Sequence, residues 1–141
     1  MATGNKFYQF VEDRAHGVHN FNSHTIKMML SNTVPLATNE VKADITEIAA
    51  GNGYTAGGFA LTKVSSAQTL GVYKVIYEDK IITASGGTLG PFRYLVFYND
   101  TPTSPADPLI VWYDIGSSIS LADGQSYLVD VSAVDGLFKD Q

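Results

Sequence analysis

The sequence predicts one mainly β domain, an antiparallel β-sandwich or barrel of about seven strands with one or two short helices. Stretches rich in β-branched and aromatic residues recur at roughly regular spacing, and Gly, Asn, Asp, Ser or Pro separate them. The length of 141 residues is near the usual size of a single domain. We therefore expect residues 1–141 to form one β domain, with residues 1–20 as a candidate helical N-terminal arm.

Two segments have helical rather than strand patterns. In Lys6–Arg14 the larger side chains recur at helical spacing, and Gly17 follows as a stop. In Glu40–Ala50 a similar apolar stripe leads into Gly51-Asn52-Gly53, where positive φ is tolerated. The first segment predicts a short amphipathic helix that needs a surface to pack on, and the second predicts a short helix or an irregular turn.

The predicted strands follow in chain order, with turn-forming residues between them. They are His24–Ser31, Phe59–Val64, Thr69–Tyr77, Lys80–Ala84, Leu89–Tyr98, Pro108–Ile115 and Tyr127–Val134. Ser31–Asn39 is expected to be a loop because Pro35 disfavours helix before it. Thr101–Pro108, with three prolines, is expected to be an exposed, stiff loop. Asp123-Gly124 predicts a type I′ hairpin turn between residues 118–121 and the last strand.

Several strands are apolar on both faces, although side chains alternate between the faces of a sheet. Phe92–Tyr98 is the clearest case. The second face must be covered either by the rest of the chain or by another subunit. Tyrosine is enriched where an apolar surface meets water, so we expect part of this surface to be an interface. The candidate interface residues are Phe7, Tyr8, Phe10, Tyr73, Tyr77, Tyr94, Tyr98 and Tyr113.

Composition argues against several functional classes. The formal net charge is −5 and the nine basic residues are scattered, which disfavours binding to nucleic acid or to an anionic membrane. The chain has no cysteine, so disulfides, thiolate metal ligands and cysteine nucleophiles are excluded. The N-terminus has no signal-peptide pattern, and no apolar run approaches the ~20 residues that span a bilayer. We expect synthesis and retention in a cytoplasm until assembly.

Candidate ligand sites in the sequence are weak. His16, His19 and His24 lie close together, but their spacing matches no familiar metal site, and surface or capping roles are the simpler interpretation. The glycines at positions 51, 53, 57 and 58 lack the strand-before, helix-after setting of a phosphate loop and suggest a tight turn around Tyr54. Three aspartates, Asp100, Asp107 and Asp114, could supply calcium ligands, but no EF-hand loop or acidic repeat is present.

Catalytic motifs are also lacking. The sequence contains no convincing GxSxG, SxxK or Ser-His-Asp arrangement. Paired carboxylates for glycoside hydrolysis are disfavoured because glutamate is scarce, with only Glu12, Glu40, Glu47 and Glu78. We expect no enzymatic activity, no cofactor and no metal.

Three segments resemble a family of small proteins of tailed bacteriophages and prophages. They are FYQFVEDRAHGVHNFNSHTIKMMLSNTVP near the N-terminus, ADITEIAAGNGYTAGG from Ala43 to Gly58, and GTLGPFRYLVFYNDTPTSPADPLIVWYDIGSSISLADGQSYLVD from Gly87 to Asp130. The glycine-rich and GPFRYLVFYNDT segments are the most specific parts. The resemblance implies a structural protein of the virion without enzymatic activity or cofactor.

Within that class we expect a capsid decoration, or cement, protein on the outer shell that bridges neighbouring major capsid proteins. It would act as a homo-oligomer, with a trimer as one arrangement, and it would be a component of the virion. A tail or baseplate component is the alternative, in which Trp112 and nearby tyrosines would stack on a host glycan. A single Trp in the middle of a strand is more often part of the core.

Overall fold

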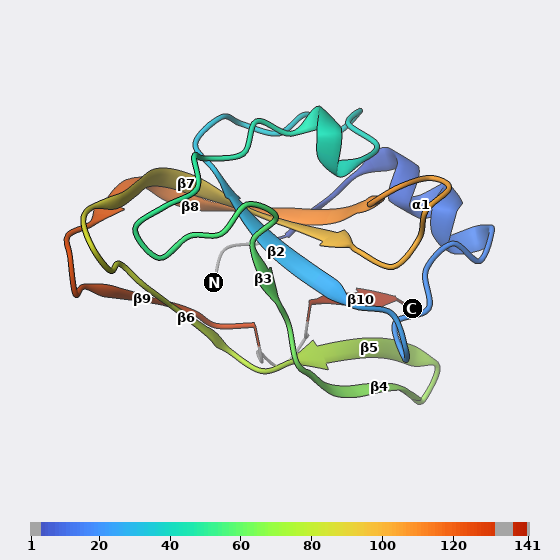
Figure 1. Ribbon diagram of the computed structural model, residues 1–141. Coiled ribbons are helices and arrows are strands. Elements are labelled where there is room, and N and C mark those ends of the chain that lie inside the picture. The colour runs from blue at the N-terminus through green and yellow to red at the C-terminus, as the bar shows by residue number, and fades with distance from the viewer. Residues whose placement is uncertain (1–3, 132–136, 141) are drawn as a thin grey trace.

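The computed structural model describes residues 4–131 and 137–140 and confirms the mainly β fold, with 48% of residues in strands (Figure 1). The elements in chain order are β1 (Asn5–Lys6), α1 (Tyr8–Ala15), β2 (Ile26–Ser31), a 3-10 turn η1 (Lys42–Asp44), β3 (Phe59–Ala60), β4 (Lys63–Thr69), β5 (Val72–Tyr77), β6 (Lys80–Thr83), β7 (Leu89–Asn99), β8 (Leu109–Leu121), β9 (Ser126–Val129) and β10 (Phe138–Asp140). The strands are more numerous than predicted, and the last three residues of the predicted strand Tyr127–Val134 lie outside the described residues.

The larger sheet is antiparallel, with strand order β1-β8-β7-β2-β3. Its centre is the β7–β8 hairpin, whose long apolar strands are joined through the proline-containing segment 101–108. The two edge strands, β1 and β3, are only two residues long each. β1 pairs only with Val111 and Trp112 of β8, so most of that 13-residue strand has no described strand on its outer side.

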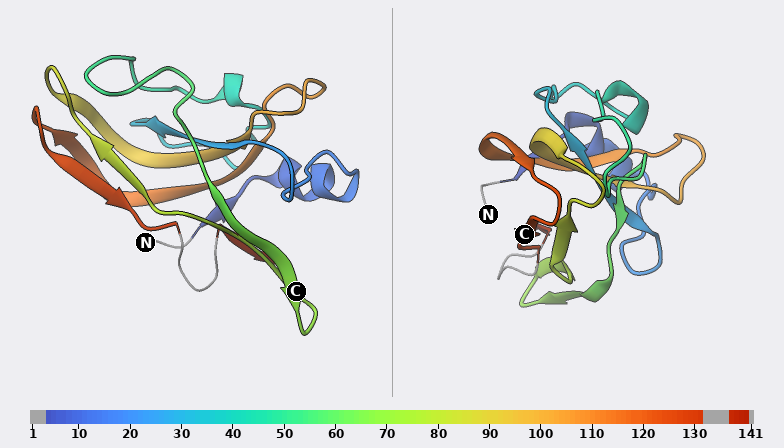
Figure 2. Two further views of the ribbon diagram at one scale, coloured as in Figure 1. Left: turned by 60° about the horizontal axis from the view of Figure 1, so that its bottom comes forward. Right: turned by 60° about the vertical axis from the view of Figure 1, so that its left-hand side comes forward.

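A second layer lies below this sheet in Figure 1 and consists of two smaller antiparallel sheets. One has strand order β10-β5-β4 and the other is the β6–β9 pair. Because β6 follows β5 after only Glu78-Asp79, the two sheets form one bent layer. The β4–β5 hairpin is the projecting end of that layer, as the left view of Figure 2 shows.

The main core lies between the two layers. Leu95, Phe97 and Tyr113 share one face of the larger sheet, because Leu95 is directly opposite Tyr113 in the β7–β8 register. Tyr113 donates a hydrogen bond to the carbonyl of Leu137, 2.6 Å away, and Leu137 in turn bonds to Val75 of β5. This face is therefore covered by the second layer.

The opposite face of the larger sheet is covered by irregular chain. Tyr98 of β7 donates a hydrogen bond to the carbonyl of Gly57, at 2.5 Å, and Ser31 of β2 donates one to the carbonyl of Thr46, at 2.6 Å. Residues 32–58 thus form a third, mostly non-regular layer. The two-sided apolar pattern is satisfied within this chain, which is one of the two explanations that the sequence left open.

Two predicted local elements differ from the structure. Glu40–Ala50 contains only the short turn η1, which is the irregular alternative rather than a full helix. Asp123-Gly124 does form a turn, closed by a 2.8 Å bond from the amide of Gln125 to the carbonyl of Ala122, but the predicted hairpin is wrong. The following strand β9 pairs with β6 instead of β8, so this turn carries the chain from one layer to the other.

The predicted N-terminal helix is present as α1, and it packs on the domain instead of projecting as an arm. Phe7 and Phe10 are fully buried, and the Phe7 ring lies 4.7 Å from the ring of Trp112 on β8. The backbone amides of Phe7 and Tyr8 bond to the carbonyls of Ile110 and Ala37. These contacts supply the packing surface that such a short helix needs.

Candidate functional site: two exposed surfaces

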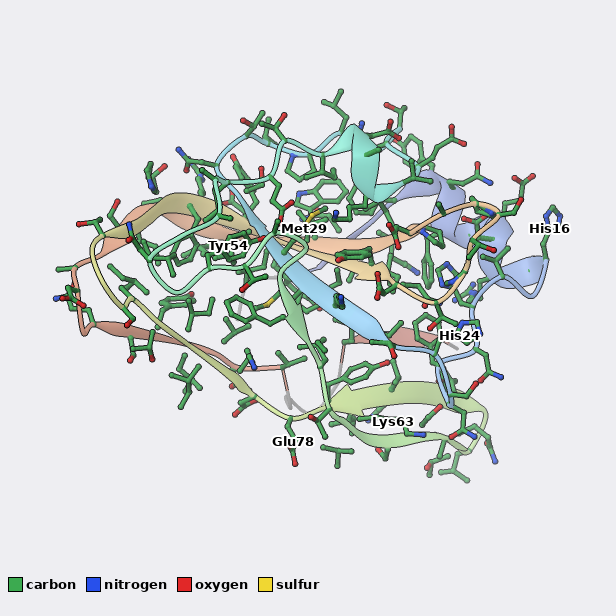
Figure 3. The ribbon with its side chains drawn as sticks, viewed as in Figure 1. His16, His24, Met29, Tyr54, Lys63 and Glu78 are labelled. Atoms are coloured by element: carbon green, nitrogen blue, oxygen red, sulfur yellow. The ribbon has the colours of Figure 1, made fainter. Side chains whose placement is uncertain are left out.

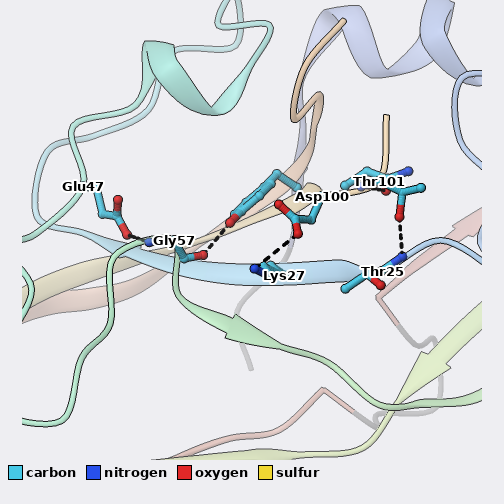
Figure 4. Close-up of polar contacts among 8 residues, drawn as sticks. Thr25, Lys27, Glu47, Gly57, Asp100 and Thr101 are labelled. Atoms are coloured by element: carbon cyan, nitrogen blue, oxygen red, sulfur yellow. Dashed lines mark hydrogen bonds and ion pairs between the residues drawn. The ribbon is translucent and has the colours of Figure 1, made fainter. Parts of the chain in front are cut away.

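The glycine-rich segment is a clamped turn. Gly51 and Tyr54 bond to each other through both backbone pairs, and the buried Tyr54 hydroxyl donates to Glu47 at 2.5 Å and accepts from the amide of Leu30 at 3.1 Å (Figure 3). The same carboxylate accepts from the amide of Gly57, at 2.6 Å, as Figure 4 shows. The predicted turn around Tyr54 is confirmed, and Glu47 is engaged in holding this turn.

We expect Tyr54→Phe to lower the free energy of unfolding by about 1–3 kcal/mol. The substitution leaves the Leu30 amide without its acceptor and removes the donor to Glu47. Urea unfolding followed by circular dichroism measures the change. Tyr8→Phe is the matched control, because it removes the same hydroxyl from a side chain that is 69% exposed. Equal stability of the two variants would contradict the clamp.

The three histidines do not share one site. His16 is exposed and points away from the body in Figure 3. His19 and His24 both face Asn99 of β7, whose side-chain nitrogen lies 3.1 and 2.9 Å from their Nδ1 atoms. Among the described residues no three His, Asp or Glu side chains come together as a metal-binding group. The histidine pair instead fastens the segment before β2 to the end of β7.

The three candidate calcium ligands are also dispersed. Asp114 forms a two-point ion pair with Arg93, with distances of 2.8 and 3.1 Å. Asp100 pairs with Lys27 at 3.2 Å, close to the bond from the Thr25 amide to Thr101 (Figure 4). Burial and the neighbouring Asp100 raise the pKa of Asp107 above its usual value. Only Asp100 and Asp107 are close to each other, and both have basic side chains nearby.

Burial changes the list of candidate interface residues. Phe7, Phe10, Tyr77, Tyr94, Tyr98 and Tyr113 are buried within the chain, so they are not available as the exposed contacts that the sequence suggested. Tyr73 is partly buried and its hydroxyl lies 2.6 Å from that of Ser66. Tyr8 alone of the eight is strongly exposed. The tyrosine-rich strand faces are core because the second layer and residues 32–58 cover them.

The first exposed surface, here called the α1 patch, consists of Tyr8, Val11, Val34 and Leu36, each at least half exposed. Tyr8 and Val11 are three residues apart on α1 and so share a helix face. The bond from the Tyr8 amide to the Ala37 carbonyl, 2.9 Å long, places the loop of Val34 and Leu36 beside the start of the helix. Buried Phe7 and Phe10 hold this helix on the sheet.

The second exposed surface is the outward face of the β4–β5 hairpin. Its cross-strand pairs are Ser65 with Ile76, Ala67 with Lys74, and Thr69 with Val72, and these six residues with Leu70 line a shallow hollow of about 490 Å³. Leu70 at the tip is 98% exposed. The other face of the same hairpin, with Val75 and Tyr77, is buried. One face of the hairpin therefore packs in the core and the other is open.

Comparison with family models, curated proteins and solved structures finds no match for this chain. Within the described residues, no helix is long and apolar enough to cross a membrane. Trp112 packs against the core, and its ring contact with Phe7 fits a packing role better than a free sugar-binding platform. The two exposed surfaces are thus the parts of the molecule with the clearest capacity for binding.

Sequence reasoning missed most of these surface residues. Val11, Val34 and Leu36 carry no motif, and Leu70 was included in a predicted strand. A partial signal was present for the hairpin. In Ser65–Thr69 the residues of both faces are small or polar, which is unusual beside the apolar alternation of the neighbouring strand. That contrast is typical of a strand at the edge of a sheet.

Proposed function

We propose that this chain is a structural protein of a tailed-phage particle, a capsid decoration protein that binds the outer shell and bridges neighbouring major capsid proteins. The phage setting rests on the sequence resemblance. The α1 patch is the observation that favours a binding role, because exposed apolar side chains on two adjoining segments are typical of protein–protein contacts. The protein acts without enzymatic activity or cofactor.

The proposed mechanism is differential binding. A protein that binds the assembled shell better than free subunits stabilises the shell by mass action. Tyr8 can serve as an anchor because it combines an apolar ring with a polar tip and loses little conformational freedom on binding. The helix that carries it is fixed by Phe7 and Phe10, so the patch needs little rearrangement to bind.

Binding to purified particles tests this role. Particles that lack the protein are mixed with wild-type chain or with the double variant Tyr8→Ser/Leu36→Ser, and occupancy and heat resistance are measured. We expect the variant to bind at least about tenfold more weakly, a loss of about 1.4 kcal/mol or more. Both positions are exposed, so the fold should be retained.

The control is the double variant Ile81→Ser/Leu128→Ser. These side chains face each other on the β6–β9 pair and are exposed to a similar degree, but they lie on the other layer. Mass spectrometry of separated heads and tails gives an independent readout. Detection on tails alone would replace the decoration role with the tail or baseplate alternative, and equal occupancy for all variants would exclude the α1 patch as the contact.

A further inference from the structure

Strand β4 has an outer edge with which no described strand pairs. It is the outermost strand of the β10-β5-β4 sheet and lies at the bottom of the molecule in Figure 1. An edge strand presents backbone N–H and C=O groups that can pair with another strand. β4 is seven residues long, whereas the edges of the larger sheet have two residues each. Among the described residues, β4 is therefore the longest strand at the edge of a sheet.

The usual protections of an edge strand are confined to the start of β4. Lys63 is its single charged residue, and its Nζ atom is bound to the backbone and side-chain oxygens of Asn22 at 2.6 and 2.7 Å. The register irregularity of the hairpin falls between Lys63 and Ser65. From Ser65 to Thr69 the strand is regular, without charge and without proline. This part has no feature that opposes pairing.

Charge favours a second copy of this chain as the occupant. The protein carries a formal charge of −5, so most contacts between two copies bring acidic surfaces together. No Asp or Glu occurs from Ile48 to Tyr77, the stretch that contains the whole hairpin. Two copies can therefore meet along β4 without placing carboxylates opposite one another. The neutral strand matches another neutral strand better than it matches a charged segment.

We propose that β4 pairs antiparallel with β4 of a second copy, so that two three-stranded sheets join across a two-fold axis. In such a pair the same patch meets itself, and outward side chains of one strand face outward side chains of the other. Here these are Ser65, Ala67 and Thr69, which are small enough to lie opposite each other in either register. In this dimer the Leu70 side chain of each copy, which is exposed at the tip of the hairpin, becomes partly buried against the other copy.

This inference gives the homo-oligomer expected from the sequence a specific contact, and it is independent of the phage assignment. The purified chain alone tests it. Sedimentation velocity over a range of concentrations should show a monomer–dimer equilibrium. Hydrogen exchange of amides in Val64–Thr69 should slow as the concentration rises, because those facing away from β5 become bonded only in the dimer.

Charge substitutions at the outward positions locate the contact. Ser65→Lys/Thr69→Lys should raise the dimer dissociation constant about tenfold or more, since Lys on an edge strand opposes pairing. Ser65→Glu/Thr69→Glu should do the same. An equimolar mixture of these two variants should form a mixed dimer, detected by native mass spectrometry, because opposite charges then face each other. Ile81→Lys/Leu128→Lys, on the β6–β9 pair, should leave the dissociation constant unchanged.

Several results would overturn the proposal. A strict monomer at the highest soluble concentration excludes it, as does a dimer that the β4 variants leave intact. Self-association abolished only by the β6–β9 variant would move the interface to that pair. Exchange in β4 that slows only when another particle protein is added would identify an extended segment of that protein as the occupant. None of these outcomes depends on whether the α1 patch binds the shell.

Discussion

Gly58→Ala should lower the free energy of unfolding by about 4 kcal/mol or more, a large part of the roughly 5–15 kcal/mol by which domains of this kind are stable. A Cβ at this position would overlap the carbonyl oxygen of Met28 and lie 2.8 Å from the Cα of Met29. Those residues are fully buried in β2, inside the larger sheet, and cannot move aside. The φ of Gly58 is +85°, so the new side chain would also be strained locally.

Gly124→Ala is the matched control. Its φ is +88°, almost the same as that of Gly58, but a Cβ there meets no atom within 4 Å. This variant should therefore lower the free energy of unfolding by only about 1 kcal/mol, which is the cost of placing a side chain in the left-handed conformation. Chemical denaturation of both variants separates the steric contribution from the conformational one. Similar losses for the two variants would show that the approach of β2 does not explain the requirement for Gly58.

The comparison of these two glycines shows where prediction from sequence stops. The sequence correctly indicates that residues 51–58 turn tightly around Tyr54, because local glycine content is enough for that inference. It does not single out Gly58. What distinguishes this glycine is its approach to β2, about 30 residues away in sequence, and such contacts are set by the whole fold. The same limit applies to Asp123-Gly124, where the turn is local and the strand partner is not.

The candidate interface shows the limit in another form. The sequence correctly identifies strands with two apolar faces, and the mainly β fold follows from them. It cannot tell whether the cover comes from the same chain. Residues 32–58 have little regular structure, yet they cover one face of the larger sheet. Ser31 and Tyr98 donate hydrogen bonds to carbonyls of this segment, and Tyr54 bonds to Glu47 inside it. All three side chains are buried. An irregular segment has no periodic sequence pattern that would mark it as the cover of a sheet. Tyrosines that it buries were therefore predicted to lie at an interface.

The protein should become less stable as the pH falls from about 6.5 towards 4, and His19 should account for about 3 kcal/mol of that loss. Burial, together with the nearby His24, lowers the pKa of His19 from 6.5 to about 4. Between these values the unfolded chain binds a proton that the folded chain does not. The contribution of His19 is therefore complete above pH 6.5 and is lost as the pH falls through this window.

The hydrogen bonds of Asn99 explain why His19 resists protonation. The amide of Thr101 donates to Asn99 Oδ1 at 3.2 Å, which orients the side-chain nitrogen as a donor towards both histidines. The Nδ1 of His19 must then be an unprotonated acceptor, which places the proton of this ring on Nε2. In His19 that Nε2 is buried and has no partner among the described residues. A second proton would remove an acceptor of Asn99 and leave a charged ring without solvation.

His19→Asn tests this explanation, because the Asn oxygen can accept the same hydrogen bond from Asn99 but does not titrate. We expect this variant to lose stability at pH 7 through poorer packing beside Phe10 and Phe21. Its unfolding free energy should nevertheless depend less on pH between 4 and 6.5, by about 3 kcal/mol over the whole window. His16→Asn is the control, because His16 is exposed and is not one of the two histidines that face Asn99. If the unfolding free energy depends on pH equally in wild type and in both variants, the loss of stability at low pH comes from a group other than His19.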